Sequence, residues 1–348
     1  MKSGKVSDTV LRRSVLQEVQ KVNQGTGIPR VGSGAGLLLL SGADGGLARA
    51  GQETEELRYG IAVSAMQTVC AEGLATAYLA AVRAVNSLAA KAARPEYALA
   101  AVTVPETMEE SLLRKMYERY GVYLRKQKIK IAGGHTAVSG AVSEPVVSVS
   151  MTGTVSKTAA RHLKKQEDYT GLDVVMTKYC GLGGTALLAG RFEEELEKRY
   201  PRRFIAHAAE LLEYTEQNEE AYLAAKEGAV YLHAAAEGGV FGALWELAEY
   251  AECGLEIDLR AIPILQETVE ICEYFDVNPY QLRTEGCFLF LTEHGGRLCE
   301  RLAEHEIAAA VIGKTVPGLD RAVRNGEEVR YLEPNRVEEY ERVRAQRK

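Results

Sequence analysis

The period with which hydrophobic residues recur differs between two segments in the first half of the chain, and this difference limits the possible folds. Apolar residues in the segment 72–91 recur at spacings of four and three, which is typical of a helix buried along one face. The segment 145–155 alternates apolar residues with serine and threonine, which indicates a half-buried strand. We predict that residues 61–69 and 145–155 are strands of one sheet and that the helix 72–91 packs on it.

Helical and strand patterns continue to alternate along the rest of the chain. A helix is predicted after residue 110, with Gly121 as its C-terminal stop. Because no G-x-G-x-x-G sequence opens a strand–helix–strand unit, a doubly wound dinucleotide-binding fold has little support. The patterns favour the α+β class, with one domain over residues 1–160, a second over residues 161–335 and a charged tail over residues 336–348, which we expect to be a solvated helix. Strands of the second domain are predicted at DVVMT, LEIDL, CFLFLT and IAAAVIG.

Composition excludes several classes of protein. The 348 residues carry a net charge of −6, so there is no global basic footprint for nucleic acid. No apolar run is long enough to span a membrane, and the charged N-terminus does not resemble a secretory signal, so we expect no membrane partner and a cytoplasmic location. The six cysteines never form a C-x-x-C pair, which argues against a zinc ribbon or a disulfide framework.

Three glycine pairs stand beside predicted strands or helix starts: Gly133-Gly134, Gly183-Gly184 and Gly238-Gly239. The first is predicted to form a turn, in the sequence GGHT. Glycine leaves backbone N–H groups unshielded, so such pairs are suited to cradle phosphate oxygens at the start of a helix. The alternative is that each pair only marks a turn between two elements.

In chain order, the motifs resemble those of the AIR synthase-related superfamily, which includes aminoimidazole ribonucleotide synthase, selenophosphate synthetase, thiamine-monophosphate kinase and the hydrogenase-maturation HypE proteins. The resemblance spans nearly the whole chain. Its marks are GLATAYLAAVRAVNSLAAK, IAGGHTAV, EPVVSVSMTGTV, DVVMTKYCGLGGTALLAG, EGGVFGALWELAE, IPILQETVEICEYFDVNPYQLRTEG and AAAVIGKT. The segments GLGGTALLA, EGGVFGALWELA and NPYQLRTEGCFLF are similar to the HypE-like branch.

The resemblance implies a two-domain AIR synthase-like (PurM-like) fold. In that fold the N-domain sheets of two copies pair in a homodimer, and the C-terminal domain is an α+β sandwich. ATP and Mg²⁺ are implied in the cleft made by N-domain strands and glycine loops. The residues that the resemblance implies for nucleotide binding are Gly32, Gly34, Gly36, Gly133, Gly134, Thr136, Lys178, Gly183, Gly184, Gly238 and Gly239.

Several positions where the family carries acidic residues hold other residues in this chain. The early glycine-rich turn runs into Leu38, the acid at a strand end is replaced by Gln67, and the Asn-Asp pair is Asn86-Ser87. The third position of the GG-x-T motif, often acidic, is His135. Because Mg²⁺ is held by hard oxygen ligands, usually carboxylates, the implied metal site is weakened.

A few residues remain as candidates for chemistry. Asp44 is the best surviving candidate for a metal ligand, and His135 and His233 are the candidate catalytic residues, although each could equally be a structural histidine. The family pattern around His233 has lost its Asp and Thr to alanine. Lys178 could reach a phosphate, and an exposed lysine at a strand end is the commoner case.

Two functions follow as hypotheses. The first is a HypE-like homologue that keeps the fold and the dimer, has weak or absent Mg²⁺-ATP chemistry and serves in a binding or regulatory role. The second is an active ATP-dependent enzyme that phosphorylates or activates a small metabolite or an amide. Because no cysteine follows Cys299, and the HypE enzymes carry the carbamoyl group on a C-terminal cysteine, we expect no nitrile chemistry in this chain.

Overall fold

A computed structural model describes Arg12, residues 36–38, 61–156, Ala159 and residues 166–216, 218–334 and 338–347. The chain divides into two compact units, each described by itself. We call Gly34–Lys164 the N-unit, and Lys165–Lys348, with which Met1–Ser33 are grouped, the C-unit. The predicted site residues Gly32, Gly34 and Asp44 lie outside the described residues.

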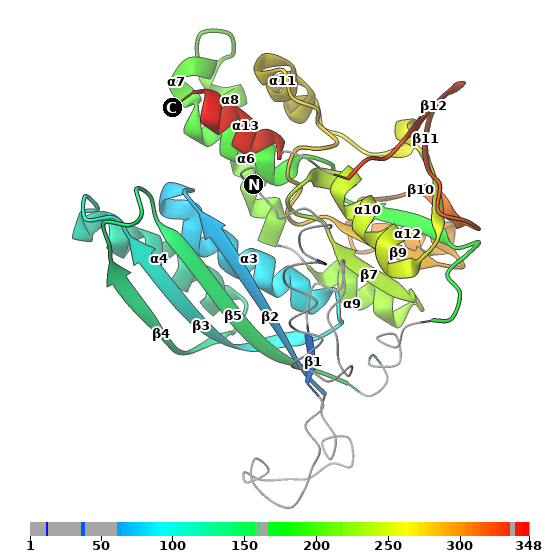
Figure 1. The fold of residues 1–348 in the computed structure, drawn as a ribbon, viewed down its shortest axis with the longest axis horizontal. Coiled ribbons are helices and arrows are strands. Elements are labelled where there is room, and N and C mark those ends of the chain that lie inside the picture. Colours follow the sequence, from blue (N-terminus) through cyan, green and yellow to red (C-terminus); the bar gives the residue numbers. More distant parts are fainter. Residues whose placement is uncertain are drawn as a thin grey trace, which may run out of the picture. The chain divides into compact units, whose positions relative to one another are not determined.

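The N-unit contains a five-stranded sheet with the order β1-β2-β5-β3-β4 (Figure 1). Its strands are β1 Gly36–Leu38, β2 Ile61–Cys70, β3 Arg94–Val104, β4 Lys130–Val138 and β5 Val146–Val155. Its helices are the 3₁₀ turn η3 Gly73–Ala75, α3 Thr76–Ala89 and α4 Glu110–Lys126. All strand pairs are antiparallel except β3 with β4. The prediction that residues 61–69 and 145–155 are strands of one sheet is confirmed, since they pair as β2 and β5, and so is the helix packed on them.

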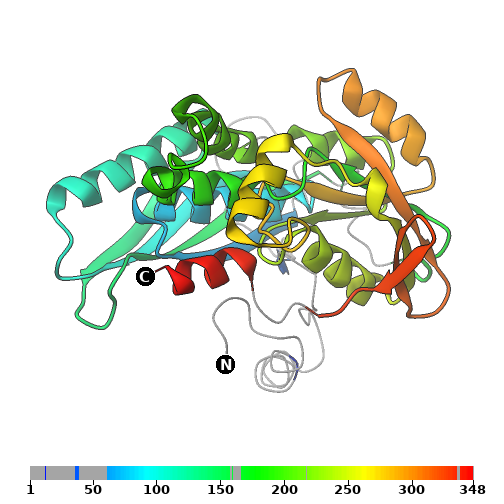
Figure 2. The same ribbon diagram turned by 90° about the horizontal axis from the view of Figure 1, so that it is seen from above.

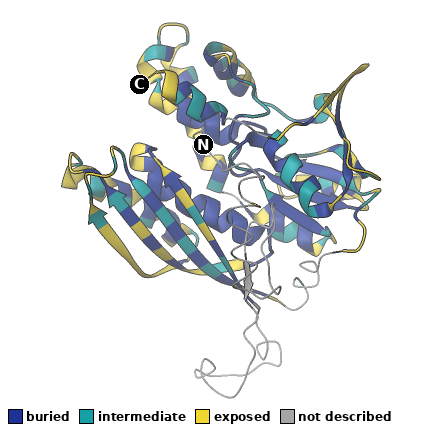
Figure 3. Cartoon of the chain, in the orientation of Figure 1, coloured by how far each residue is buried: buried dark blue, intermediate teal, exposed yellow. Residues whose placement is uncertain are grey.

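The two faces of this sheet differ. On one face α3 packs across β2 and β5, with α4 beside it, and the β5 residues Val147, Val149 and Met151 point into this core and are fully buried. On the other face β2, β5 and β3 expose small, hydroxyl-bearing and apolar side chains, so burial alternates along each strand (Figure 3). Among the described residues of the N-unit, α3 and α4 both lie on the same face, and the opposite face is uncovered.

Two predictions about glycine in the N-unit are wrong. Helix α4 continues five residues past Gly121 to Lys126, because Tyr123 and Leu124 keep contributing buried side chains and tertiary packing outweighs the low helix propensity of glycine. The GGHT sequence forms no turn but lies inside β4. A Cβ atom at Gly134 would overlap the carbonyl oxygen of Ala100, so this glycine allows β4 to lie close against β3.

The C-unit contains a seven-stranded sheet with the order β12-β11-β8-β10-β6-β9-β7. Only β11 and β8 pair in parallel. The strands are β6 Asp173–Thr177, β7 Tyr231–Ala234, β8 Gly254–Asp258, β9 Phe288–Thr292, β10 Ala309–Val316, β11 Arg321–Asn325 and β12 Glu328–Tyr331. The helices are α6 Leu182–Arg191, α7 Glu193–Leu196, α8 Arg202–Glu210, η5 Leu211–Glu216, α9 Glu219–Lys226, α10 Gly239–Ala251, η6 Leu259–Ala261, α11 Gln266–Phe275, α12 Gly295–Ala303 and α13 Glu339–Gln346.

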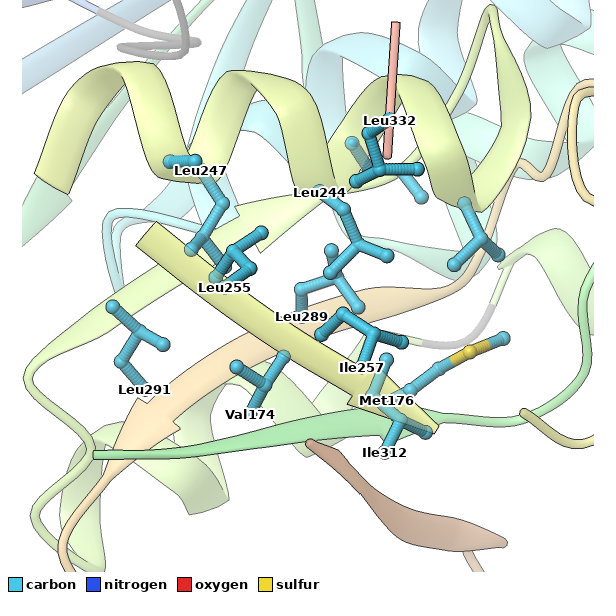
Figure 4. Packing of buried hydrophobic residues seen from close by; sticks show 14 of the residues in the cluster. Val174, Met176, Leu244, Leu247, Leu255, Ile257, Leu289, Leu291, Ile312 and Leu332 are labelled. Carbon is cyan, nitrogen blue, oxygen red and sulfur yellow. The ribbon is translucent and has the colours of Figure 1, made fainter. Parts of the chain in front are cut away.

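Helices cover both faces of this sheet. Helix α10 packs on one face, where its Leu244 and Leu247 belong to the same buried cluster as Val174 and Met176 of β6 (Figure 4). Helix α12 packs against β6 and β10, and Figure 2 shows it, in orange, on the side of the sheet opposite α10. The arrangement is the α+β sandwich expected of the second domain. The charged tail differs from expectation, because α13 buries Tyr340 and Val343 instead of being wholly solvated.

Candidate functional site

In the N-unit, two of the positions where the resemblance implies acids in the family are in direct contact. Gln67 lies on β2 and its Nε2 donates a hydrogen bond of 3.0 Å to Oγ of Ser87 on α3. The pair offers one amide and one hydroxyl, both neutral and already hydrogen-bonded to each other. Because Mg²⁺ prefers carboxylate and water oxygens, this pair does not fit a Mg²⁺ site. The third such position, Leu38, lies on β1 opposite Ala62 of β2.

The GGHT residues are spread over both faces of β4. His135 pairs with Ala101 of β3 and is exposed on the uncovered face of the sheet. Thr136 points the other way, where its Oγ1 lies 2.7 Å from the hydroxyl of Tyr117 on α4. The strand therefore separates these two candidates instead of gathering them around one ligand. Gly36 lies on β1, opposite Ser64 of β2.

In the C-unit, one segment links the two remaining glycine pairs. We call residues 280–286 the hub segment. Gly181, the residue before α6, donates its N–H to Oγ1 of Thr284 at 2.8 Å, and Gly184 donates to the carbonyl of Arg283 at 2.9 Å. Thr284 in turn donates to the carbonyl of Ala236, just before α10, at 3.0 Å. The starts of α6 and α10 are thus tied to the same few residues.

The glycines of these pairs make room for the hub segment. A Cβ atom at Gly183 would overlap the carboxylate of Glu285, and one at Gly239 would overlap the carbonyls of Tyr280 and Leu282. Glu285 is only 1% exposed. A carboxylate of the protein therefore lies against the first turn of α6, at the end of the helix where the backbone dipole attracts negative charge.

Lys178 is 3% exposed and takes part in internal contacts. Its Nζ lies 2.5 Å from Oε1 of Glu220 on α9 and donates a 2.6 Å hydrogen bond to the carbonyl of Gly286 in the hub segment. Burial raises the pKa of the Glu220 carboxyl, and the ammonium of Lys178 beside it acts in the opposite direction. The structure thus places this lysine inside an ion pair and not at an exposed strand end.

His233 lies on β7, a strand that the sequence did not predict. Its Nε2 is 3.1 Å from Oε2 of Glu246 on α10, and its Nδ1 is 3.4 Å from the hydroxyl of Tyr231. Complete burial raises the pKa of Tyr231 well above that of an ordinary phenol, so Tyr231 is neutral near pH 7. The imidazole is held between a carboxylate and a neutral phenol.

Sequence reasoning missed Arg283 and Glu285 as residues with special environments. Both are almost fully buried. The only signal in the sequence was the presence of two charged residues shortly before a predicted apolar strand. Within the described residues, no group of three or more His, Cys, Asp or Glu side chains could hold a metal ion. A search of the same residues for a helix long and apolar enough to cross a membrane found none.

Comparisons with known proteins agree with this architecture. Sequence models of AIR synthase related proteins match residues 56–155 for the N-terminal domain and residues 170–324 for the C-terminal domain. The carbamoyl dehydratase HypE of Rhodobacter capsulatus is 28% identical over 236 residues, which are 67% of this chain and 67% of that protein.

Two solved structures have a similar fold. HypE of E. coli matches with a TM-score of 0.70 and 20% identity, over 81% of this chain and 88% of that one. A hydrogenase-maturation protein HypE in complex with ATP matches with a TM-score of 0.65 and 16% identity, over 97% of both chains. At these identities the likeness concerns the fold, and it confirms the predicted α+β, two-domain PurM-like architecture.

Proposed function

Because the chain belongs to the AIR synthase-related protein family, we propose that it is a HypE-like protein with weak or absent Mg²⁺-ATP chemistry and a binding or regulatory role. The observation that carries this proposal is the hydrogen bond between Gln67 and Ser87. Phosphoryl chemistry with ATP depends on metal ions that bridge phosphate oxygens and carboxylates. A neutral amide–hydroxyl pair in place of two carboxylates would leave the metal with fewer ligands.

The environment of the glycine pairs supports the same proposal. The start of α6 is next to the buried Glu285 carboxylate, and the Lys178 ammonium is paired with Glu220. A phosphate placed near Gly183 would lie next to the carboxylate of Glu285, and Lys178 is already paired with Glu220. We therefore expect nucleotide affinity to be low and to depend little on Mg²⁺.

The alternative function is an active ATP-dependent enzyme that phosphorylates or activates a small metabolite or an amide. Its support is the similarity in fold to a HypE protein in complex with ATP along nearly the whole chain. An active enzyme would need metal ligands at other positions. Asp44 remains the candidate for such a ligand, and it lies outside the described residues.

The second part of the proposal is a homodimer that forms through the uncovered face of the N-unit sheet. Met66 of β2 and Leu99 of β3 are 63% and 49% exposed there, and both lie opposite Ser150 of β5 in one row across the sheet. Tyr97, two residues before Leu99 on β3, is 46% exposed as well. An exposed apolar patch of this kind marks an interaction surface.

A double substitution, Gln67→Asp with Ser87→Asp, tests the proposed loss of the metal site. Two carboxylates at contact distance repel each other unless a cation lies between them, so the variant should gain a Mg²⁺ site. We expect Mg²⁺ to tighten ATP binding to the variant by about tenfold or more and to leave the unmodified protein almost unchanged. Calorimetric titration of ATP with and without Mg²⁺ measures both effects.

The matched control is Gln67→Asn with Ser87→Asn, which introduces side chains of nearly the same size without charge. The control should bind ATP as the unmodified protein does. If the Asp variant folds, as judged by its circular dichroism, but shows no Mg²⁺ dependence beyond that of the control, these positions are not the lost metal site and the proposal loses its main support.

A further inference from the structure

The C-terminal helix α13 is held on the C-unit through Arg283 of the hub segment. Nη2 of Arg283 lies 3.2 Å from Oε2 of Glu338 and 3.4 Å from Oε1 of Glu341, and its guanidinium lies 4.5 Å from the centre of the Tyr340 ring. The backbone N–H of Arg283 also donates to Oε1 of Glu338 at 3.3 Å. Arg283, Glu338 and Tyr340 are all at least nine-tenths buried. We call these contacts the C-terminal latch.

One carboxylate serves both the latch and the helix. Glu338 is the N-cap of α13 and accepts the N–H groups of Tyr340 and Glu341. The helix has only eight residues, and a helix of this length is unstable on its own in water. Further contacts hold it, because Arg342 donates to the carbonyl of Asp276, and Arg347 pairs with Glu195 at 3.1 Å and lies 4.8 Å from the centre of the Phe275 ring. Helix α13 therefore persists only while it is docked.

The latch residue is directly joined to the starts of α6 and α10. The carbonyl of Arg283 accepts the N–H of Gly184, and the next residue, Thr284, donates to Ala236 and accepts from Gly181. A shift of Arg283 on release of α13 would thus move hydrogen-bond partners of both helix starts. Helix α13 is therefore connected to both helix starts through two consecutive residues, Arg283 and Thr284.

We propose that α13 is a detachable regulatory element whose docking, through Arg283, holds residues 181–185 and 236–239 in their ordered arrangement. Release of α13 would remove these contacts of Arg283 and loosen both helix starts. By linkage, anything that stabilises those helix starts must also favour the docked helix. The inference goes beyond the proposed function, because the coupling exists whether or not a nucleotide binds.

Hydrogen exchange measured by mass spectrometry on the full-length protein tests the coupling. Tyr340→Ser removes the ring that lies against the guanidinium of Arg283, and it leaves Arg283 and both helix starts unsubstituted. We expect exchange in residues 338–347 to rise by about tenfold or more, and exchange in residues 181–185 and 236–239 to rise by at least about threefold. Strand β9 should keep its protection, which shows that the C-unit remains folded.

Two further variants complete the test. Arg283→Met removes the latch from the other side and should give the same pattern as Tyr340→Ser. Arg347→Met is the matched control, because it weakens the far end of α13 without touching the latch, and it should leave residues 181–185 and 236–239 unchanged. The proposal is overturned if α13 exchanges faster while both helix starts stay protected. It is equally overturned if α13 keeps its protection in both latch variants.

Discussion

Replacing Lys178 with methionine is expected to lower the free energy of unfolding of the C-unit by about 3–5 kcal/mol near neutral pH. The variant would leave the fully buried Glu220 without the ammonium that now lies 2.5 Å away, and the carbonyl of Gly286 without its donor. Urea unfolding followed by the fluorescence of Trp245, the only tryptophan of the chain and a residue of α10, measures the change in this unit.

The loss should depend on pH in a defined direction. Without Lys178, burial would raise the folded-state pKa of Glu220 further above the value of about 4.3 of an unfolded glutamate. A group with a raised pKa contributes its stability below the unfolded value and loses it as the pH rises through the folded value. The deficit of Lys178→Met should therefore be smallest in acid and should grow toward neutral pH.

Two companion variants show whether the buried charge is the cause. Lys226→Met removes an exposed lysine of α9 and should change the unfolding free energy by no more than about 0.5 kcal/mol. Lys178→Met combined with Glu220→Gln removes both charges and should recover part of the loss. A cost below about 1 kcal/mol for Lys178→Met alone would contradict an internal structural role and would return Lys178 to the candidates for phosphate binding.

Met66→Lys combined with Leu99→Lys is expected to convert the proposed homodimer into monomers at micromolar concentration. The two residues lie in one row of the uncovered face of the N-unit sheet, so each copy would bring two ammonium groups into an apolar contact. Burying unpaired charges is costly, and we expect the dissociation constant to rise by about a hundredfold or more. Sedimentation velocity over a concentration series measures the change.

The control for this prediction places the same charges on the helical side of the N-unit. Leu112 and Val122 of α4 are 40% and 57% exposed, so Leu112→Lys with Val122→Lys adds the same charge to similarly exposed apolar positions. This variant should remain dimeric. A protein that is already monomeric without substitution, or a control that dissociates as readily as the sheet variant, would contradict pairing through the sheet face.

Local patterns predicted much of the N-unit. The strands at residues 61–69 and 145–155 and the helix between them are confirmed, because apolar residues recur in each with a regular period. The same reasoning failed at GGHT and at Gly121. In both places a tertiary contact, with β3 for Gly134 and with the core for Tyr123, decided the conformation against the local preference of glycine.

In the C-unit, strands β6, β8, β9 and β10 were predicted, and β7, β11 and β12 were not. Strands β11 and β12 form a hairpin of mostly polar residues, and β7 has only four residues, so none of the three shows a clear hydrophobic period. The family resemblance correctly predicted the two-domain fold. Gln67 and Ser87, which are neighbours in space, were singled out only through the same resemblance. Hydrophobic periodicity does not relate two residues that lie on different elements.

The hub segment could not be predicted from sequence. Its partners come from the start of α6, the loop before α10 and the C-terminal helix, and these segments are far apart along the chain. The glycine pairs were noticed, but their role as space for Glu285 and for backbone carbonyls follows only from the packing. The role of such a short polar segment can be inferred only once the buried groups that it contacts are known.

We propose that Mg²⁺-ATP chemistry is weak or absent in this chain. The most direct test is a calorimetric titration of the unmodified protein with ATP, with and without Mg²⁺, together with an assay for phosphate release. We predict weak binding that Mg²⁺ barely changes and hydrolysis no faster than in buffer. Tight, Mg²⁺-dependent binding with turnover of about 1 per second or more would contradict the claim and would support an active enzyme.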